Sequence, residues 1–142
     1  MRVEGTITSG CGRHAELHVP GYHDIPQATA DWPTVVCPGS LNIAVDPNVI
    51  NAIEEGKFPS PTFEIEQGQF GNNRLTPTET MPRRGVGRVW RALLESNGHS
   101  IGCWVLRRYG SRMSKALEIV SEEHLRTRCQ LKDGQAAVVR FV

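Results

Sequence analysis

The chain has 142 residues, of which 39% are hydrophobic and 22% are charged, and its formal net charge is +1. This length suffices for one domain with its own hydrophobic core. The near-neutral charge provides no general attraction to nucleic acid or to a membrane surface. No apolar run approaches the ~20 residues that a membrane-spanning helix needs. The 14 glycines and nine prolines favour short strands joined by turns over a helical bundle.

The four cysteines, Cys11, Cys37, Cys103 and Cys129, form no C-x-x-C pair, and the sequence shows no signal peptide. This usage is typical of reduced, mostly buried thiols. We therefore expect a cytoplasmic protein of one domain (1–142), a monomer or a small homo-oligomer that binds neither nucleic acid nor membrane.

The first strand is expected over residues 2–9, and a glycine-punctuated loop around Gly10 and Gly12 follows it. Residues 15–19 read as a return strand. Glycines let a backbone approach a phosphate closely, because no side chain stands in the way. Most loops of this kind are only turns, so a phosphate site and a plain turn are both open here.

A tight turn at Pro38-Gly39 runs into a second strand. Ser40 and Asn42 lie two residues apart, so they share one face of that strand, whereas Leu41 and its apolar neighbours face the core. A hydroxyl and an amide oxygen suit a hard cation such as Mg²⁺, which substrate phosphates often help to hold. The alternative is ordinary turn chemistry, in which Ser and Asn only cap the turn.

Asp46-Pro47 predicts the start of a helix that ends before Gly56. Further strands are expected over 62–66, 85–94 and 101–106. The last two are joined at Asn97-Gly98, a strong hairpin signal.

Arginines are concentrated in the loop 107–112 and in a second group, Arg83, Arg84, Arg88 and Arg91. They predict either a solvated face or a positive patch that meets an anionic ligand.

The closing part of the chain reads as strand, helix, turn and strand. Residues 116–120 form an apolar run that contains Glu118, which either faces solvent or contacts a ligand. A helix is expected to begin at Ser121, and a helix N-terminus after a strand can bind an anion. A turn over 131–135 and a strand over 136–142 follow.

Three motifs occur in one order: Gly5-x-x-x-Ser9-Gly10-x-Gly12, Pro38-Gly39-Ser40-Leu41-Asn42, and Leu117-Glu118-Ile119-Val120 … Leu125-Arg126 … Leu131-Lys132-Asp133-Gly134. Their order and spacing resemble the CTP-dependent riboflavin kinases best known from archaea. The match is good over 3–19, 37–46 and 116–142 and poor over 47–100. The resemblance implies a six-stranded cradle-loop (RIFT-like) β-barrel with one or two short helices. It also implies phosphoryl transfer from CTP to riboflavin, giving FMN and CDP, with Mg²⁺.

The resemblance also assigns roles to residues of this chain. Ser40 and Asn42 would hold the metal. Glu118 would contact the flavin substrate, as catalytic base or only to orient it, and Ser111 would be a further substrate contact. The nucleotide contacts would be Gly10, Cys11, Gly12, Arg13, His14, Ala15, Glu16, Glu123, His124, Leu125 and Arg126.

The chain departs from the family pattern at three places. Arg13 and His14 stand where the family has an acid and a third glycine, Ser40 replaces a threonine, and Gln135 replaces an aspartate. Alternative functions are a kinase with another donor or another hydroxyl acceptor, and a barrel that binds nucleotide or flavin without turnover. A third is a nucleic-acid-binding barrel that uses the arginines, which the near-neutral charge disfavours.

Overall fold

The computed structural model describes residues 1–9, 41–66 and 75–142. These residues form seven β-strands and two short helices, so the predicted mainly β class is confirmed. The strands are β1 (Arg2–Thr8), β2 (Leu41–Ala44), β3 (Phe63–Ile65), β4 (Gly87–Ser96), β5 (His99–Arg108), β6 (Ala116–Val120) and β7 (Ala136–Phe141). The helices are α1 (Pro47–Glu54) and α2 (Leu125–Arg128).

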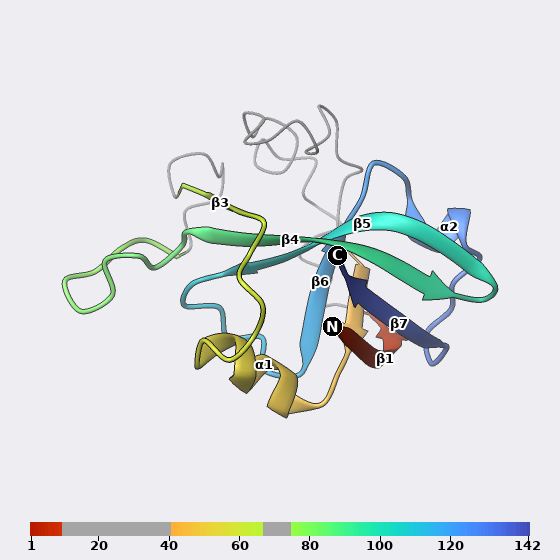
Figure 1. Cartoon of the computed structure of the whole chain (residues 1–142), viewed down its shortest axis with the longest axis horizontal. Helices are drawn as coiled ribbons and strands as arrows, with labels where there is room; N and C mark the ends of the chain where they lie inside the picture. The colour runs from red at the N-terminus through yellow and green to blue at the C-terminus, as the bar shows by residue number, and fades with distance from the viewer. Residues whose placement is uncertain (10–40, 67–74) are drawn as a thin grey trace.

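The strands pair antiparallel, and their pairings form a ring in the order β4–β5–β6–β2–β1–β7 and back to β4 (Figure 1). The ring closes through β4, which is ten residues long. One edge of β4 pairs with β5, and the other edge is shared between β3, at Gly87–Val89, and β7, at Ala92–Glu95. The described residues therefore hold a ring of six strands with β3 added beside it, seven strands where six were expected.

Apolar residues occupy both faces of this sheet, because side chains alternate along each strand. The main core includes Ile7, Ile43, Val105, Ile119 and Val139, each at most 1% exposed. A second buried cluster comprises Ile65, Val89, Trp104, Leu106 and Val120. Strands β5 and β6 contribute to both clusters. Glu118 of β6 lies opposite Leu106 of the second cluster, so it has an apolar neighbour.

Helix α1 begins and ends as its sequence predicts. The Asp46 side chain accepts a hydrogen bond from the Asn48 N–H, and Pro47 occupies the first helical turn, where its missing N–H leaves no bond unmade. Ile50 and Ile53 are buried in the main core. The helix therefore packs its apolar side onto the sheet.

The β4–β5 hairpin turns at Asn97 and Gly98, which have positive φ values of 52° and 76°. Two central residues with positive φ define the turn type that matches the twist of paired strands, and Asn-Gly favours it. The Asn97 side chain also donates to the Cys129 carbonyl oxygen at 3.1 Å. The predicted hairpin is thus confirmed, and its tip is tied to the end of α2.

The predicted helix start at Ser121 is wrong. The Ser121 hydroxyl accepts from the Glu123 N–H at 3.3 Å, in a turn that precedes the helix. Helix α2 begins at Leu125 and is four residues long, and its N-cap is His124, whose side chain accepts from the Thr127 N–H. Serine can bond its neighbouring backbone in a turn as readily as in a cap, which explains the error.

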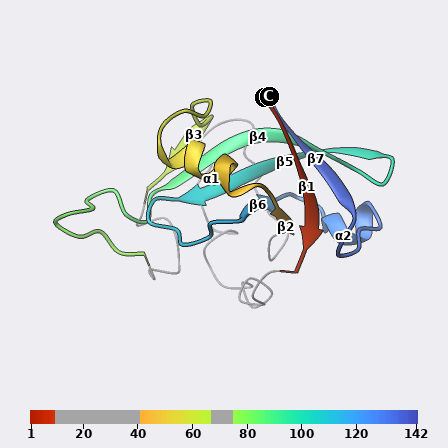
Figure 2. The same ribbon diagram turned by 90° about the horizontal axis from the view of Figure 1, so that it is seen from below.

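The first and last described strands bring the chain ends together, as Figures 1 and 2 both show. The Phe141 N–H donates to the Met1 carbonyl oxygen at 2.9 Å. Among the described residues, neither helix is long and apolar enough to cross a membrane.

Candidate functional site

Three polar side chains lie in one row across adjacent strands. Thr8 of β1 is directly opposite Asn42 of β2, and Asn42 is directly opposite Glu118 of β6. Residues opposite each other in antiparallel strands share a face and lie close together. Thr8, Asn42 and Glu118, hereafter the polar row, therefore form one site on the sheet, and two of its members were predicted site residues.

Asn42 is the most informative member of the polar row. Its neighbours Leu41 and Ile43 face the main core, as predicted, so its amide points to the opposite face. The side chain is only 6% exposed, and its Oδ1 accepts no hydrogen bond from any described residue. Leaving a buried acceptor unsatisfied costs about 1–3 kcal/mol, so such an atom in a folded protein calls for a reason.

Glu118 is half-buried between polar and apolar neighbours. Leu106 of β5 lies opposite it on one side, and Asn42 lies opposite it on the other. Leu106 belongs to the second apolar cluster, together with Trp104 and Val120. Glu118 thus lies between the buried second apolar cluster and the polar row.

A second group of polar residues clamps the end of β1 beside the polar row. Arg126 donates to the Thr8 carbonyl oxygen at 3.2 Å and to Asp133 Oδ1 at 2.7 Å, and the Ser9 hydroxyl donates to Asp133 Oδ2. The Ser9 hydroxyl, and then Arg126, lower the pKa of the Asp133 carboxyl. Ser9, Arg126 and Asp133, the β1 clamp, therefore hold a charged pair next to Thr8.

The four predicted nucleotide residues at the start of α2 differ in burial and in their contacts. Glu123 and His124 are exposed; Glu123 pairs with Arg128 at 3.6 Å, and His124 caps α2. Leu125 is 5% exposed and belongs to the main core, so its side chain serves packing. Arg126 is the one of these residues whose side chain donates a hydrogen bond to a member of the polar row, at the Thr8 carbonyl oxygen.

Ser111 lies in the connection 109–115 between β5 and β6. Its hydroxyl accepts from the Met113 N–H at 3.3 Å, and its own N–H donates to the Arg108 carbonyl oxygen at 3.1 Å. The connection leads into β6 and hence to Glu118, two residues after the strand begins. Ser111 and Glu118 thus belong to consecutive parts of the chain.

Eight predicted site residues fall outside the described part of the chain. They are the loop residues Gly10, Cys11, Gly12, Arg13, His14, Ala15 and Glu16 and the candidate metal ligand Ser40.

The arginines expected to form a positive patch or a solvated face are divided between two environments. Arg88 and Arg107 are only 4% and 7% exposed, and both donate to the Glu54 carboxylate. Arg83 pairs with Glu64 on the surface. Arg88 and Arg107 therefore belong neither to a solvated face nor to an open positive patch, because they are buried and paired with Glu54.

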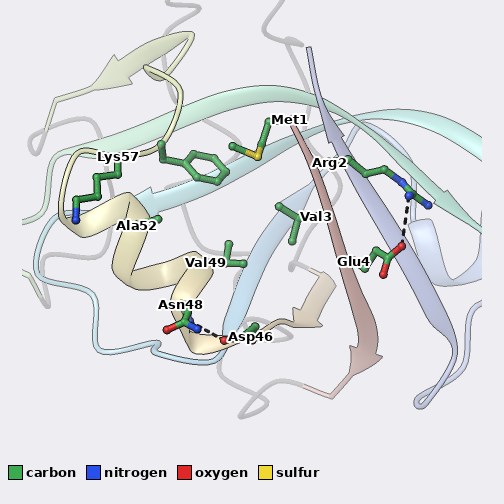
Figure 3. A pocket seen from close by; sticks show the side chains of 10 residues that line it. Met1, Arg2, Val3, Glu4, Asp46, Asn48, Val49, Ala52 and Lys57 are labelled. Carbon is green, nitrogen blue, oxygen red and sulfur yellow. Dashed lines mark hydrogen bonds and ion pairs between the residues drawn. The ribbon is translucent and has the colours of Figure 1, made fainter.

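A pocket of about 670 Å³ lies elsewhere, between the start of β1 and helix α1 (Figure 3). Val3, Val49 and Ala52 line it, and Arg2 and Glu4 pair across its edge at 3.4 Å. Thr8 is four residues beyond Glu4, about 13 Å along an extended strand. The pocket is therefore separate from the polar row.

The described cysteines are buried, and the described residues hold no cluster of His, Cys, Asp and Glu side chains. In residues 1–9, 41–66 and 75–142, no three His, Cys, Asp or Glu side chains gather into a metal-binding group. Cys103 and Cys129 are buried free thiols, as expected, and burial raises the pKa of Cys103 to about 12. Cys11 and Cys37 lie outside the described residues.

Comparison with protein-family models and with curated proteins finds no match to this chain. The candidate site therefore rests on its own geometry.

Sequence reasoning missed Thr8 and Asp133 as members of the site. Thr8 joins Asn42 only through the β1–β2 register, and Ser9 meets Asp133 across 124 residues of sequence. A signal was available for Ser9 and Asp133, because both stand in the motifs that carry the family resemblance, but none was available for Thr8.

Proposed function

We propose that this chain transfers a phosphoryl group from CTP to riboflavin, giving FMN and CDP, with the help of Mg²⁺. The observation that carries the proposal is the buried Asn42 Oδ1, which lacks a donor among the described residues and lies in register with Glu118. An amide oxygen without a donor suits a cation, and a carboxylate beside it suits a substrate hydroxyl.

The proposal includes the finer fold, a six-stranded cradle-loop barrel. The ring of strand pairings from β4 through β7 supports it, with β3 as an addition on the edge of β4. In this proposal the phosphate-binding loop follows Ser9, next to the β1 clamp. A cytoplasmic location, where CTP and riboflavin are both available, belongs to the same proposal.

The residues present fit a magnesium ion that the substrate helps to hold. Asn42 supplies one neutral oxygen, and Ser40, which lies outside the described residues, would supply a second. The described residues provide no carboxylate cluster, so CTP phosphates would complete the shell, as is common for Mg²⁺. When bound, the ion neutralises charge on the phosphate oxygens.

The protein groups position the reactants. A hydroxyl oxygen of riboflavin forms a bond to the γ-phosphorus, the bond from that phosphorus to the β–γ bridging oxygen breaks, and CDP leaves with the bond's electron pair. We assign Glu118 the contact to the acceptor hydroxyl, whose proton it accepts. Arg126 contacts the Thr8 carbonyl oxygen, in the first strand of the polar row, and we assign it to the nucleotide.

A phosphotransfer assay tests the proposal. Purified protein, Mg²⁺ and riboflavin are incubated with CTP or ATP in parallel, and FMN is measured by chromatography. FMN from CTP alone is the expected result. FMN from ATP as well would retain the kinase and assign the altered donor choice to the Arg13–His14 loop.

Other outcomes would overturn the proposal. CDP release with a different hydroxyl compound, and none with riboflavin, would mean another acceptor. Tight binding of CDP or FMN without turnover over hours would make the chain a binding protein. Affinity for RNA that falls steeply with salt would favour the nucleic-acid alternative.

A further inference from the structure

Arg107, the second-last residue of β5, connects three separate parts of the molecule. Its side chain is 7% exposed. Nε donates to Glu54 at the end of α1, Nη1 donates to the Met113 carbonyl oxygen at 2.6 Å, and Nη2 donates to the Ser111 carbonyl oxygen at 3.4 Å. One buried guanidinium therefore ties helix α1 to the connection that carries Ser111.

Glu54 fixes this guanidinium in place. Its Oε1 also accepts from Arg88 Nη2 at 3.1 Å. Burial raises the pKa of Glu54, but the two guanidiniums outweigh burial, and the net shift is downward, so the carboxylate is charged at neutral pH. Because Arg88 and Arg107 are both buried, Glu54 is their shared counter-charge.

The connection 109–115 depends on these two arginines for its path. The Arg88 guanidinium lies 3.9 Å from the centre of the Tyr109 ring, a cation–π contact at the start of the connection. Arg107 binds two carbonyl oxygens farther along it. The connection then enters β6, where Glu118 is the third residue.

We propose that Arg107, held by Glu54, is a positioning residue for the acceptor substrate. By holding the carbonyls of Ser111 and Met113, it sets the backbone of the connection that leads to Glu118, the residue assigned to the acceptor hydroxyl. The role requires arginine, because a planar fork reaches several partners at fixed angles, whereas a lysine ammonium on a flexible stem does not. This inference rests on the proposed riboflavin kinase activity.

The test compares Arg107→Lys with Arg140→Lys. Arg140 is a matched control, since its guanidinium also pairs with a glutamate, Glu95, through Nε at 2.9 Å, but it is exposed and far from the connection in sequence. For Arg107→Lys we expect the KM for riboflavin to rise about tenfold, with the KM for CTP within about twofold of wild type. Arg140→Lys is expected to change neither.

An active, folded Arg107→Lys variant with an unchanged riboflavin KM would overturn the inference, as would an equal rise in both KM values. If the proposed function itself is wrong, the wild-type protein forms no FMN. Arg107 then has no acceptor substrate to position. In that case, hydrogen exchange of the backbone amides of 109–115 tests whether Arg107 holds the backbone of the connection. Faster exchange in Arg107→Lys than in Arg140→Lys supports control of the connection, and equal exchange refutes it.

Discussion

Asn42 and Glu118 lie directly opposite each other on the paired strands β2 and β6, and the Asn42 amide oxygen is buried without a donor from any described residue. A core position with this pattern carries a stability cost that a leucine or alanine would not. A ligand that this oxygen coordinates, or that donates a hydrogen bond to it, would remove that cost.

The first prediction separates function from folding at Asn42. Since Oδ1 lacks a donor, Asn42→Ala removes an unsatisfied group, and we expect a free energy of unfolding within about 1 kcal/mol of wild type. We expect FMN formation to fall by about 100-fold, as for loss of a metal ligand. Urea unfolding and the phosphotransfer assay measure the two effects. Asn48→Ala, at an exposed position of α1, is the control and should alter neither; equal activity of both variants would contradict the prediction.

The second prediction concerns the β1 clamp. Asp133→Asn weakens the attraction that holds Arg126 beside Thr8, so we expect a higher KM for CTP with little change in the KM for riboflavin. Glu122→Gln removes an exposed acid from the connection before α2 and should leave both constants unchanged. A riboflavin effect larger than the CTP effect would place the clamp at the acceptor instead.

The third prediction concerns stability in acid. Glu54 has a folded-state pKa below its ordinary value of 4.5, so its contribution is complete above about pH 4.5 and is lost as the pH falls through the lowered pKa. We expect Glu54→Gln to cost about 1–2 kcal/mol at pH 7, a value reduced because the Glu54 side chain is 40% exposed. The difference from wild type should shrink below pH 4.5.

Chemical unfolding from pH 7 to pH 3 measures this effect. Glu95→Gln, which breaks the exposed pair with Arg140, is the control and is expected to cost at most about 0.5 kcal/mol at pH 7. If the difference in the free energy of unfolding between Glu54→Gln and wild type stayed constant from pH 7 to pH 3, the assignment of Glu54 as the shared counter-charge would be refuted.

The fourth prediction concerns the close approach of β1 and β2. A Cβ added at Gly5 would lie 2.4 Å from the Ala44 carbonyl oxygen and 2.6 Å from Ile43 Cγ2. Gly5→Ala should therefore cost about 3 kcal/mol. Gly102→Ala, in β5, would meet no described atom within 4 Å and should change stability by less than about 0.5 kcal/mol. Similar urea midpoints of unfolding for Gly5→Ala and Gly102→Ala would show that β1 and β2 can move apart without loss of stability.

Local signals predicted much of this fold, and long-range pairings account for what was missed. Asp46-Pro47 and Asn97-Gly98 act over a few residues, and the apolar run 116–120 predicted a strand with its observed bounds. The resemblance implied a closed barrel, but local patterns could not show that β4 and β7 are the strands that pair to close the ring, because pairing partners depend on tertiary contacts.

The site shows the same division. Alternation predicted that Asn42 faces away from Leu41, and this is confirmed. Register decided that Thr8 and Glu118 lie on either side of Asn42. The buried pairing of Arg88 and Arg107 with Glu54 had no sequence signal, because the partners are 34 and 53 residues apart.

The closing strand β7 has a consequence for synthesis of the protein. β7 pairs with β1 and with β4, which both precede it in the chain, so these two pairings wait for residues 136–141 to leave the ribosome. Until then, one edge of β1 and part of one edge of β4 are open to pairing with other chains. Contacts between segments so distant in sequence also slow folding. A newborn chain therefore passes through an aggregation-sensitive interval that lasts until β7 docks.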